Sequence, residues 1–239
     1  MLAAGRHLGR LSSRLCVADS GLFSSSIKLV ILPRTRAGLG REGLREYLET
    51  VHGPMVVNAP DVSGNFSTYV HHYTQDLAEA EGVTPLIDRD AVTIIRLRNL
   101  EDLRASKASA GYRNKVGPDE DNFRDTDGSV ALLAEEQEVV AGADNAPRKL
   151  FIFRNAMQAS VDEWASTLSG IVRDNRLLGA IINDAKVVEG QFPYLQFDEI
   201  GLPLRSDPER VAAIVARASR EHFGSVDTGL IYAETVRFI

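Results

Sequence analysis

The same short plan occurs twice along this chain, and this repetition limits the folds that the chain can adopt. Near the start, the apolar run KLVIL from Lys28 is followed by an amphipathic stretch and then by FSTYVHHYTQD. Near the middle, KLFIF from Lys149 is followed by SVDEWASTLSGIV, which has the spacing of an amphipathic helix. Apolar runs that lead into helical patterns are typical of strand–helix–strand units. The chain is therefore predicted to contain two copies of one α+β unit.

The first repeat is predicted to span residues 27–145 in the order β-α-β-β-α-β. Apolar and β-branched residues predict its strands at 27–34, 66–73, 91–98 and 129–140. Its second helix is expected after Asn99, a residue type that often caps helices. Its first helix is expected from Arg41, with an apolar stripe formed by Leu44, Tyr47, Leu48, Val51 and Met55. Gly53-Pro54 should kink or end that helix, which places His52 on the flank of the stripe.

The second repeat, residues 146–239, is predicted to follow the same order. Its strands are expected at 149–154, 180–188, 194–200 and 229–238. Its helices should begin after Ser160 and after Ser206 or Asp207. A four-stranded sheet with helices on one face must bury its other face. We therefore expect two ferredoxin-like repeats packed sheet to sheet as a dimeric-α/β-barrel-like fold.

The amino-acid composition indicates which kinds of molecule this protein can bind. The chain has 239 residues, is 44% hydrophobic and 25% charged, and contains a single cysteine, Cys16, so an intrachain disulfide is excluded. A net charge of -6 without a basic stripe argues against nucleic acid. No apolar run approaches the roughly 20 residues of a membrane helix. The expected partner is a small-molecule substrate, with a homodimer as a further possibility.

Residues 1–26 differ from the rest, since they contain three arginines (Arg6, Arg10 and Arg14), a single acid (Asp19) and six serines. Such composition resembles an organelle transit peptide. A disordered tail or a start-site artefact is the favoured reading, and the protein is expected to be cytoplasmic.

Repeat one resembles an EthD-type domain of the dimeric α/β-barrel superfamily over roughly residues 27–142. The matching features are His52-Gly53-Pro54, Tyr69-Val70-x-His72, Asn99-Leu-Glu-Asp and Asp121-x-Phe123. Repeat two has Arg173-Asp174 where His-Gly-Pro would stand. The resemblance implies cofactor-free dehydratases, decarboxylases, cyclases or isomerases acting on aromatic, polyketide or lactone compounds. Other members accompany ether-degrading oxygenases, so the family fixes a fold better than a reaction.

His52 is the first candidate for chemistry, as a general acid/base that moves a proton next to a carbonyl. The alternative is an imidazole that stabilises the negative end of its helix. Tyr69, His71 and Tyr73 share one strand face, and if this face lines the barrel interior it offers ring walls and hydrogen-bond donors. The alternative is an ordinary cross-strand aromatic cluster. His72 falls on the opposite face, but the family pattern favours it, so His71 and His72 both stay candidates.

Asp121 is expected to orient His52, although the acidic run at 119–127 also has the composition of a solvated loop. Calcium is excluded, because Arg124 stands where the calcium loop needs glycine. Tyr73, Met55 and Phe123 are expected to contact the substrate. The five histidines are scattered, so no metal site is predicted. Haem bound through His52, His71 or His222 is a minor alternative, and no cofactor is expected.

These observations together predict a cofactor-independent lyase or isomerase that acts on a small, largely apolar carbonyl compound. The main alternative is a non-catalytic small-molecule-binding protein that serves an oxygenase.

Overall fold

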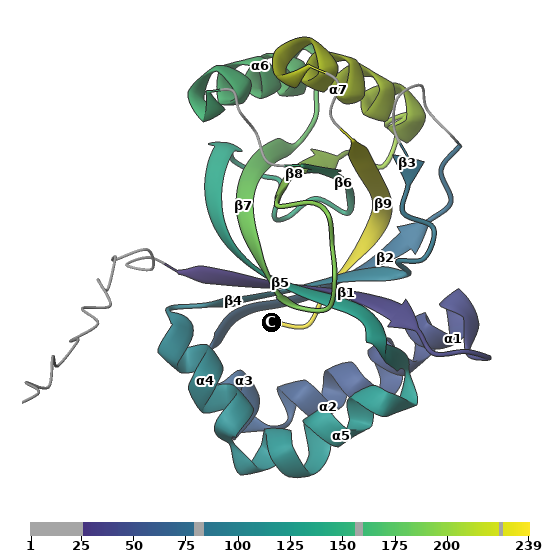
Figure 1. The fold of residues 1–239 in the computed structure, drawn as a ribbon, viewed down its shortest axis with the longest axis vertical. Helices are drawn as coiled ribbons and strands as arrows, with labels where there is room; N and C mark the ends of the chain where they lie inside the picture. The colour runs from purple at the N-terminus through teal and green to yellow at the C-terminus, as the bar shows by residue number, and fades with distance from the viewer. Residues whose placement is uncertain (1–25, 79–83, 156–159, 225–226) are drawn as a thin grey trace, which may run out of the picture.

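Eight long strands close into an antiparallel barrel in the part of the chain that the computed structural model describes, residues 26–78, 84–155, 160–224 and 227–239 (Figure 1). The strand order around the barrel is β2-β4-β1-β5-β7-β8-β6-β9, and β9 pairs with β2 to close it. The strands are β1 (Ile27–Thr35), β2 (Phe66–Gln75), β4 (Ala91–Leu97), β5 (Arg124–Val140), β6 (Arg148–Arg154), β7 (Gly179–Glu189), β8 (Gln196–Leu202) and β9 (Thr228–Arg237). The two-residue strand β3 (Thr84–Pro85) lies parallel to β9.

The helices lie outside the barrel and cover its two halves separately (Figure 1). Repeat two carries α6 (Val161–Asp174) and α7 (Pro208–Phe223). Repeat one carries more and shorter pieces: α1 (Gly40–Tyr47), η1 (Leu48–His52), α2 (Gly53–Val57), α3 (Pro60–Ser63), α4 (Leu100–Ala108), η2 (Tyr112–Val116), α5 (Gly117–Asp119) and η3 (Glu120–Asn122). The long strands and these helical segments follow the predicted β-α-β-β-α-β order in both repeats.

Helix starts agree with the capping residues of the sequence. The side chains of Asn99, Ser160 and Asp207 accept hydrogen bonds from backbone N–H groups in the first turns of α4, α6 and α7. Side-chain caps of this kind satisfy donors that a helix start leaves free, and each contributes about 1 kcal/mol. None of the helices in the described ranges combines the length and the apolar character needed to cross a membrane.

Strand pairing is the same in the two repeats. Within each, the second strand pairs with the third, the third with the first, and the first with the fourth. The repeats are joined by β5 against β7 and by β2 against β9. The predicted barrel is therefore confirmed, and the two sheets are also hydrogen-bonded edge to edge, which leaves no free edge among these eight strands.

The barrel interior is filled. Alternate strand residues point inward and form one apolar cluster that includes Val30, Leu32, Phe151 and Phe153. Lys28 from β1 and Lys149 from β6 also point inward, and both pair with Glu199 of β8, at 2.5 and 2.6 Å. All three charged side chains are buried. A substrate therefore has to bind elsewhere.

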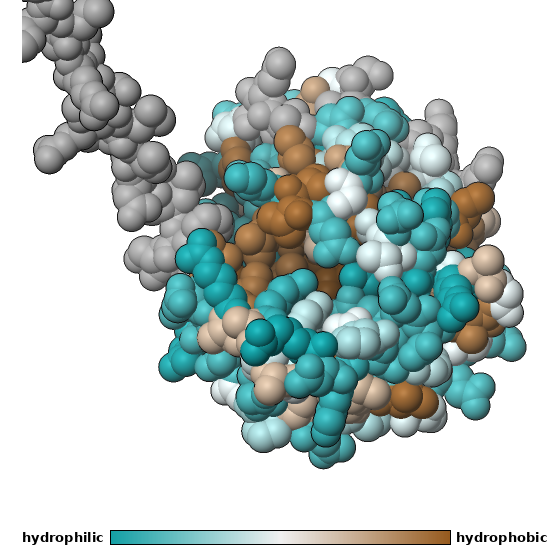
Figure 2. All heavy atoms as spheres, turned by 60° about the horizontal axis from the view of Figure 1, so that its bottom comes forward, coloured by the Kyte–Doolittle hydropathy of each residue, from teal (hydrophilic) through white to brown (hydrophobic). Residues whose placement is uncertain are grey.

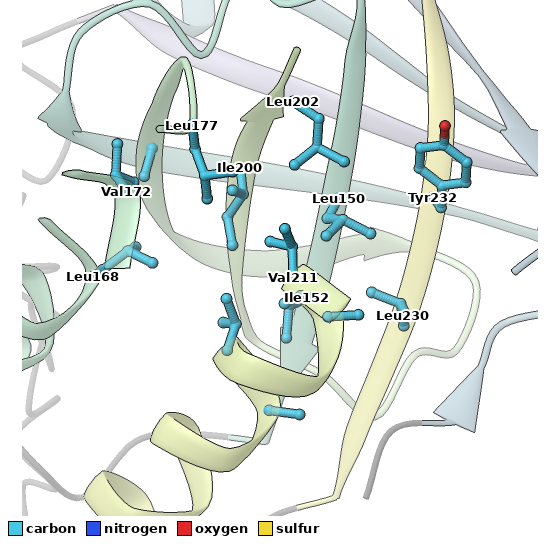
Figure 3. Close-up of a cluster of buried hydrophobic side chains, with 14 of the residues drawn as sticks. Leu150, Ile152, Leu168, Val172, Leu177, Ile200, Leu202, Val211, Leu230 and Tyr232 are labelled. Carbon is cyan, nitrogen blue, oxygen red and sulfur yellow. The ribbon is translucent and has the colours of Figure 1, made fainter. Parts of the chain in front are cut away.

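The outer face of the repeat-two sheet packs against α6 and α7 and forms a hydrophobic core with them (Figure 3). Leu150 and Ile152 of β6 pack there against Leu168 of α6 and Val211 of α7. Burial of one such side chain contributes roughly 1.5–3 kcal/mol. Trp164 lies in the same layer and is fully buried. The outer face of repeat one is covered less completely, and the candidate site lies there.

Candidate active site

The sequence predicted that Gly53-Pro54 would kink or end the helix that carries His52, and in the structure the helix does not end there. It passes through one π-helical turn, in which the Gly53 N–H donates to the Leu48 carbonyl, and continues as α2. Pro54 falls in the first turn of α2, where proline is tolerated. Single π turns inside α-helices often occur at functional sites.

The π turn also changes which residues are buried. Since it places more residues in a turn, four-residue spacing stays on one face, and Leu44, Leu48, His52 and Val56 are all buried. Val51, which the predicted stripe included, is 39% exposed. His52 thus lies within the buried stripe and not on its flank.

Gly53 has a steric role next to His52. A Cβ atom at this position would lie 2.5 Å from a ring carbon of Phe238 and 2.6 Å from the Leu48 carbonyl oxygen. Phe238 follows β9 and packs against Tyr69 and His71, with ring centroids 5.5 and 5.1 Å apart. The second repeat therefore contributes an aromatic wall behind the site of the first.

Asp119 fixes the orientation of the His52 ring. Its carboxylate oxygen Oδ2 lies 2.8 Å from His52 Nδ1, and Oδ1 accepts hydrogen bonds from Tyr47 Oη at 2.6 Å and from Asn122 Nδ2 at 3.0 Å. An ionised carboxylate can only accept, so Nδ1 carries the proton and donates it. The other nitrogen, Nε2, is then left with its lone pair. The arrangement matches that of a histidine base oriented by an aspartate.

Burial and hydrogen bonding set the charge of this pair. Burial lowers the pKa of His52 below its ordinary value, and the adjacent Asp119 only partly offsets this effect. Burial alone would raise the pKa of Asp119, but hydrogen bonds from Tyr47, His52 and Asn122 outweigh it and leave that pKa below its ordinary range. At neutral pH the pair is a neutral imidazole and a carboxylate, which is the base-competent state.

A second hydrogen-bonded group comes from the strands. His71 Nε2 lies 2.9 Å from Tyr69 Oη, and His71 Nδ1 lies 2.8 Å from Thr93 Oγ1. Burial lowers the pKa of His71 to about 3, with a small further effect of His52, and burial also raises the pKa of Tyr69. Both groups are therefore uncharged at neutral pH and act as hydrogen-bond partners.

The two groups share one apolar pocket between the outer face of the repeat-one sheet and the helices beneath it. Figure 2 shows apolar side chains gathered in a recess on this side of the molecule. Aliphatic and aromatic side chains form most of the lining, including Leu29, Ile31, Leu48, Val56, Phe66, Ile95, Val116 and Phe123. His52, Tyr69, His71 and Thr93 supply polar atoms within it. Mostly apolar walls with a few converging polar groups are typical of small-molecule sites.

The face of β2 that carries Tyr69, His71 and Tyr73 does not line the barrel interior, which was one of the two arrangements considered from the sequence. It lies on the outer face, where Tyr69 is opposite Ile95 and His71 opposite Thr93. The helices of repeat one cover this face, so the pocket forms there.

His71 and His72 are separated by the strand. His71 lines the pocket, whereas His72 points into the barrel, where it contacts the Phe151 ring at 5.1 Å and Thr235 Oγ1 at 3.1 Å. Burial and the nearby Lys149 hold the pKa of His72 well below its ordinary value. The structure therefore favours His71 over His72 as a site residue.

Asp121 is not the residue that orients His52. Its side chain is exposed and accepts a hydrogen bond from Thr126 Oγ1 at 3.2 Å. The acidic run is not an open loop either, because α5, η3 and the start of β5 occupy it. This short helical path turns Asp119, two residues earlier, toward His52. Asp119 and Asn122 were missed because the sequence did not predict these helical turns, and Tyr47 was missed because only the tertiary fold brings it to Asp119.

The three predicted substrate contacts have different outcomes. Phe123 lines the pocket, and its ring centroid lies 4.6 Å from that of His52. Tyr73 is buried beside the pocket, with its ring stacked at 5.9 Å from His71 and the Arg45 guanidinium 5.0 Å away on its face. Met55 packs against the adjoining core and is not among the lining residues.

The histidines considered for haem differ in the same way. Both ring nitrogens of His71 have partners, and His222 Nε2 lies 3.3 Å from the Ser160 carbonyl oxygen in repeat two. Of these candidates, His52 has a pocket-facing ring with one nitrogen that bonds to none of the described residues. Within the described ranges, no group of three His, Cys, Asp or Glu side chains is arranged to hold a metal ion.

Comparison with known proteins supports the family resemblance. Residues 36–127 match the family model of the EthD domain, which confirms the resemblance predicted for repeat one. Comparison with curated protein sequences gave no match.

Solved structures align with this chain over most of its length. An anthrone oxidase-like protein is 12% identical, with 90% of this chain and 94% of that chain covered and a TM-score of 0.52. A chlorite dismutase-like protein is 6% identical, with coverages of 90% and 96% and a TM-score of 0.50. A monooxygenase-like protein from Lactobacillus acidophilus NCFM is 10% identical, with coverages of 90% and 95% and a TM-score of 0.47. At these identities the first two structures show a likeness of fold alone, that of the dimeric α/β barrel.

Proposed function

We propose that this protein is a cofactor-independent enzyme, a lyase or isomerase, that uses His52 as a general acid/base on a small, largely apolar carbonyl compound. The observation that carries the proposal is the His52–Asp119 hydrogen bond of 2.8 Å at the wall of an apolar pocket. The EthD match over residues 36–127 is consistent with a small-molecule role.

In the proposed reaction, His52 Nε2 takes a proton from the carbon next to the substrate carbonyl. The electrons of the broken C–H bond form an enolate, whose oxygen accepts a hydrogen bond from Tyr69. His71 can support this if its Nε2–H donates to the phenol oxygen and Thr93 donates to Nδ1, which leaves the phenol hydrogen for the substrate. The imidazolium is stabilised by Asp119 and then returns the proton, to another carbon in an isomerase or to a leaving hydroxyl in a dehydratase.

The burial of the site favours this chemistry. Because the pKa of His52 lies below its ordinary value, the base is already unprotonated at neutral pH. We therefore expect kcat/KM to be constant near neutral pH and to fall only in more acidic solution, as His52 takes up a proton. A profile that rises with a midpoint above pH 7 would contradict the assignment of His52 as the base.

The test is solvent hydrogen exchange, since it detects proton abstraction whatever the later steps are. The protein is incubated in D₂O with 2-tetralone, a two-ring ketone with acidic hydrogens next to its carbonyl, and deuterium incorporation is followed by NMR. We expect exchange above background, and we expect His52→Ala to reduce it by about 100-fold or more with its circular dichroism unchanged. His222→Ala, a histidine change in repeat two, is the matched control and should exchange like the wild type.

Two other outcomes decide against the proposal. If His52→Ala exchanges as fast as the wild type, His52 is not the base. If 2-tetralone and related lactones and aryl ketones bind without exchange, and bind equally to His52→Ala, the protein is a small-molecule-binding accessory protein.

A further inference from the structure

The pocket of His52 continues into a second cavity on the outer surface of the barrel. The two cavities share Leu29, Ile31, Leu103, Lys107, Glu120 and Arg124 as lining residues. The outer cavity runs on over β5 and β7, where Ala131, Leu133 and Val188 form an apolar floor. A molecule that reaches His52 with one end can therefore lie along this floor with the other.

Arg124 is the buried cation at the junction of the two cavities. It is 8% exposed, which is unusual for arginine, and it lines both spaces. Its Nη2 pairs with Glu120 and lies 3.1 Å from Glu189. Among the residues that the structure describes, every polar contact of this guanidinium runs through Nη2, and Nε is buried without a partner. A buried arginine with unused N–H donors is suited to donate a hydrogen bond to an oxygen atom of a ligand.

The charges around Arg124 indicate which kind of oxygen it would bind. Glu120 and Glu189 both line the outer cavity beside it, and Lys107 at the rim is exposed. The two carboxylates offset Arg124 and Lys107, so the site has no net positive charge, and an incoming carboxylate would meet repulsion from Glu120 and Glu189 beside Arg124. A neutral carbonyl or ether oxygen would meet no such repulsion and could still accept a charge-assisted hydrogen bond.

We propose that Arg124 is a substrate-binding and specificity-determining residue that binds a second, uncharged oxygen acceptor on an elongated apolar substrate. This inference rests on the proposed function, because it assumes that the reacting carbonyl lies at His52. The substrate class is then a neutral compound of more than one ring, or of comparable length, with two separated oxygen acceptors.

Binding of three matched probes to the full-length protein tests the proposal without requiring turnover. The probes are 2-acetylnaphthalene, 2,6-diacetylnaphthalene and 6-acetyl-2-naphthoate, with affinities measured by ligand-observed NMR titration. We expect 2,6-diacetylnaphthalene to bind about tenfold more tightly than 2-acetylnaphthalene, since a hydrogen bond to a charged donor is added. The naphthoate should bind no more tightly than 2-acetylnaphthalene. Equal affinities for the two ketones, or a preference for the naphthoate, would overturn the proposal.

Variants of Arg124 test whether this residue causes the preference for the diacetyl probe. Arg124→Met should remove the preference for the diacetyl probe, so that the two ketones bind with equal affinity. Arg113→Met, which changes an exposed arginine outside the pocket, should keep the preference. Because Arg124→Met leaves carboxylates unpaired, the double variant Arg124→Met/Glu120→Gln is measured alongside it. A preference that persists in both would overturn the proposal.

Failure of this inference can be told apart from failure of the proposed function. Preference for the diacetyl probe without hydrogen exchange would uphold Arg124 and refute catalysis. Hydrogen exchange of 2-tetralone with no preference among the naphthalene probes would uphold catalysis and refute the role of Arg124.

Discussion

Replacement of His71 by glutamine removes a titrating group from the most deeply buried ring of the site. The pKa of His71 is lowered to about 3 by burial, with a small further effect of His52. In the unfolded chain the same group titrates near its ordinary value of about 6.5. Between these two values the unfolded chain binds a proton that the folded protein does not. The His71 contribution to stability is therefore complete above about pH 6.5 and is lost as the pH falls toward 3.

The size of the effect follows from the difference between the two pKa values. Each pH unit below the unfolded value costs about 1.4 kcal/mol of unfolding free energy for one such group. At pH 5 the loss due to His71 is about 2 kcal/mol, and near pH 3 it approaches about 5 kcal/mol. Since domains are usually stable by about 5–15 kcal/mol, the loss is readily measured.

The assay is urea unfolding at pH 7 and pH 5, followed by the fluorescence of Trp164, the single tryptophan of the chain. Glutamine retains an amide that can bond to Tyr69 or Thr93 but does not titrate. We expect the wild type to lose about 2 kcal/mol more than His71→Gln between the two pH values, because the other histidines contribute equally to both proteins. His222→Gln is the matched control and should behave like the wild type. An equal loss in wild type and His71→Gln would refute the assignment of a depressed pKa to His71.

Three further predictions concern other parts of the structure. Asp119→Asn should reduce hydrogen exchange of 2-tetralone by up to about 100-fold, and by no more than His52→Ala does, without unfolding the protein, since an amide can donate to Nδ1 and move the imidazole proton to Nε2. Unchanged exchange rates would contradict this. Gly53→Ala should lower the free energy of unfolding in urea by about 1–3 kcal/mol, because the added Cβ would lie 2.5 Å from the Phe238 ring. Gly170→Ala in α6, where the nearest atom to the added Cβ lies at 3.8 Å, should be neutral or should stabilise the protein by up to about 1 kcal/mol. Equal effects of the two substitutions would refute the steric reasoning. Glu199→Gln should cost about 3–5 kcal/mol by leaving Lys28 and Lys149 without their shared carboxylate, while the exposed Glu221→Gln should change the midpoint little.

The repeat structure could be predicted from the sequence because it depends on local signals. Runs rich in apolar and β-branched residues marked the eight long strands. Asn99 and Ser160 marked helix starts correctly, since a cap is decided within one turn. The π turn could not be predicted, because nothing local to residues 48–52 requires it. Gly53, which follows the turn, lies against Phe238, a residue more than 180 positions later in the chain.

Some residues of the candidate site could be predicted from the sequence and others could not. His52 and Tyr69 were identified from the sequence, and the structure places both at one pocket. The choice between His71 and His72 depended on which face of β2 the helices cover, which strand alternation alone does not decide. Asp121 was predicted in place of Asp119, because the direction of the Asp119 side chain is set by the short helical turns at 117–122. The catalytic roles of these residues, the absence of a cofactor and a homodimer of the fused barrel all stay predictions.

Because both halves of the barrel belong to one chain, assembly of the site does not depend on protein concentration, and the two halves can diverge in sequence. Repeat one alone would present two open strand edges, β2 and β5, which β9 and β7 cover in the full chain. A free half would therefore have to find a second half by diffusion, and its active fraction would fall on dilution. In the fused chain the effective concentration of the second half does not depend on that of the protein. The two halves are also free to differ, so one can keep a pocket while the other devotes the equivalent face to a core around Trp164.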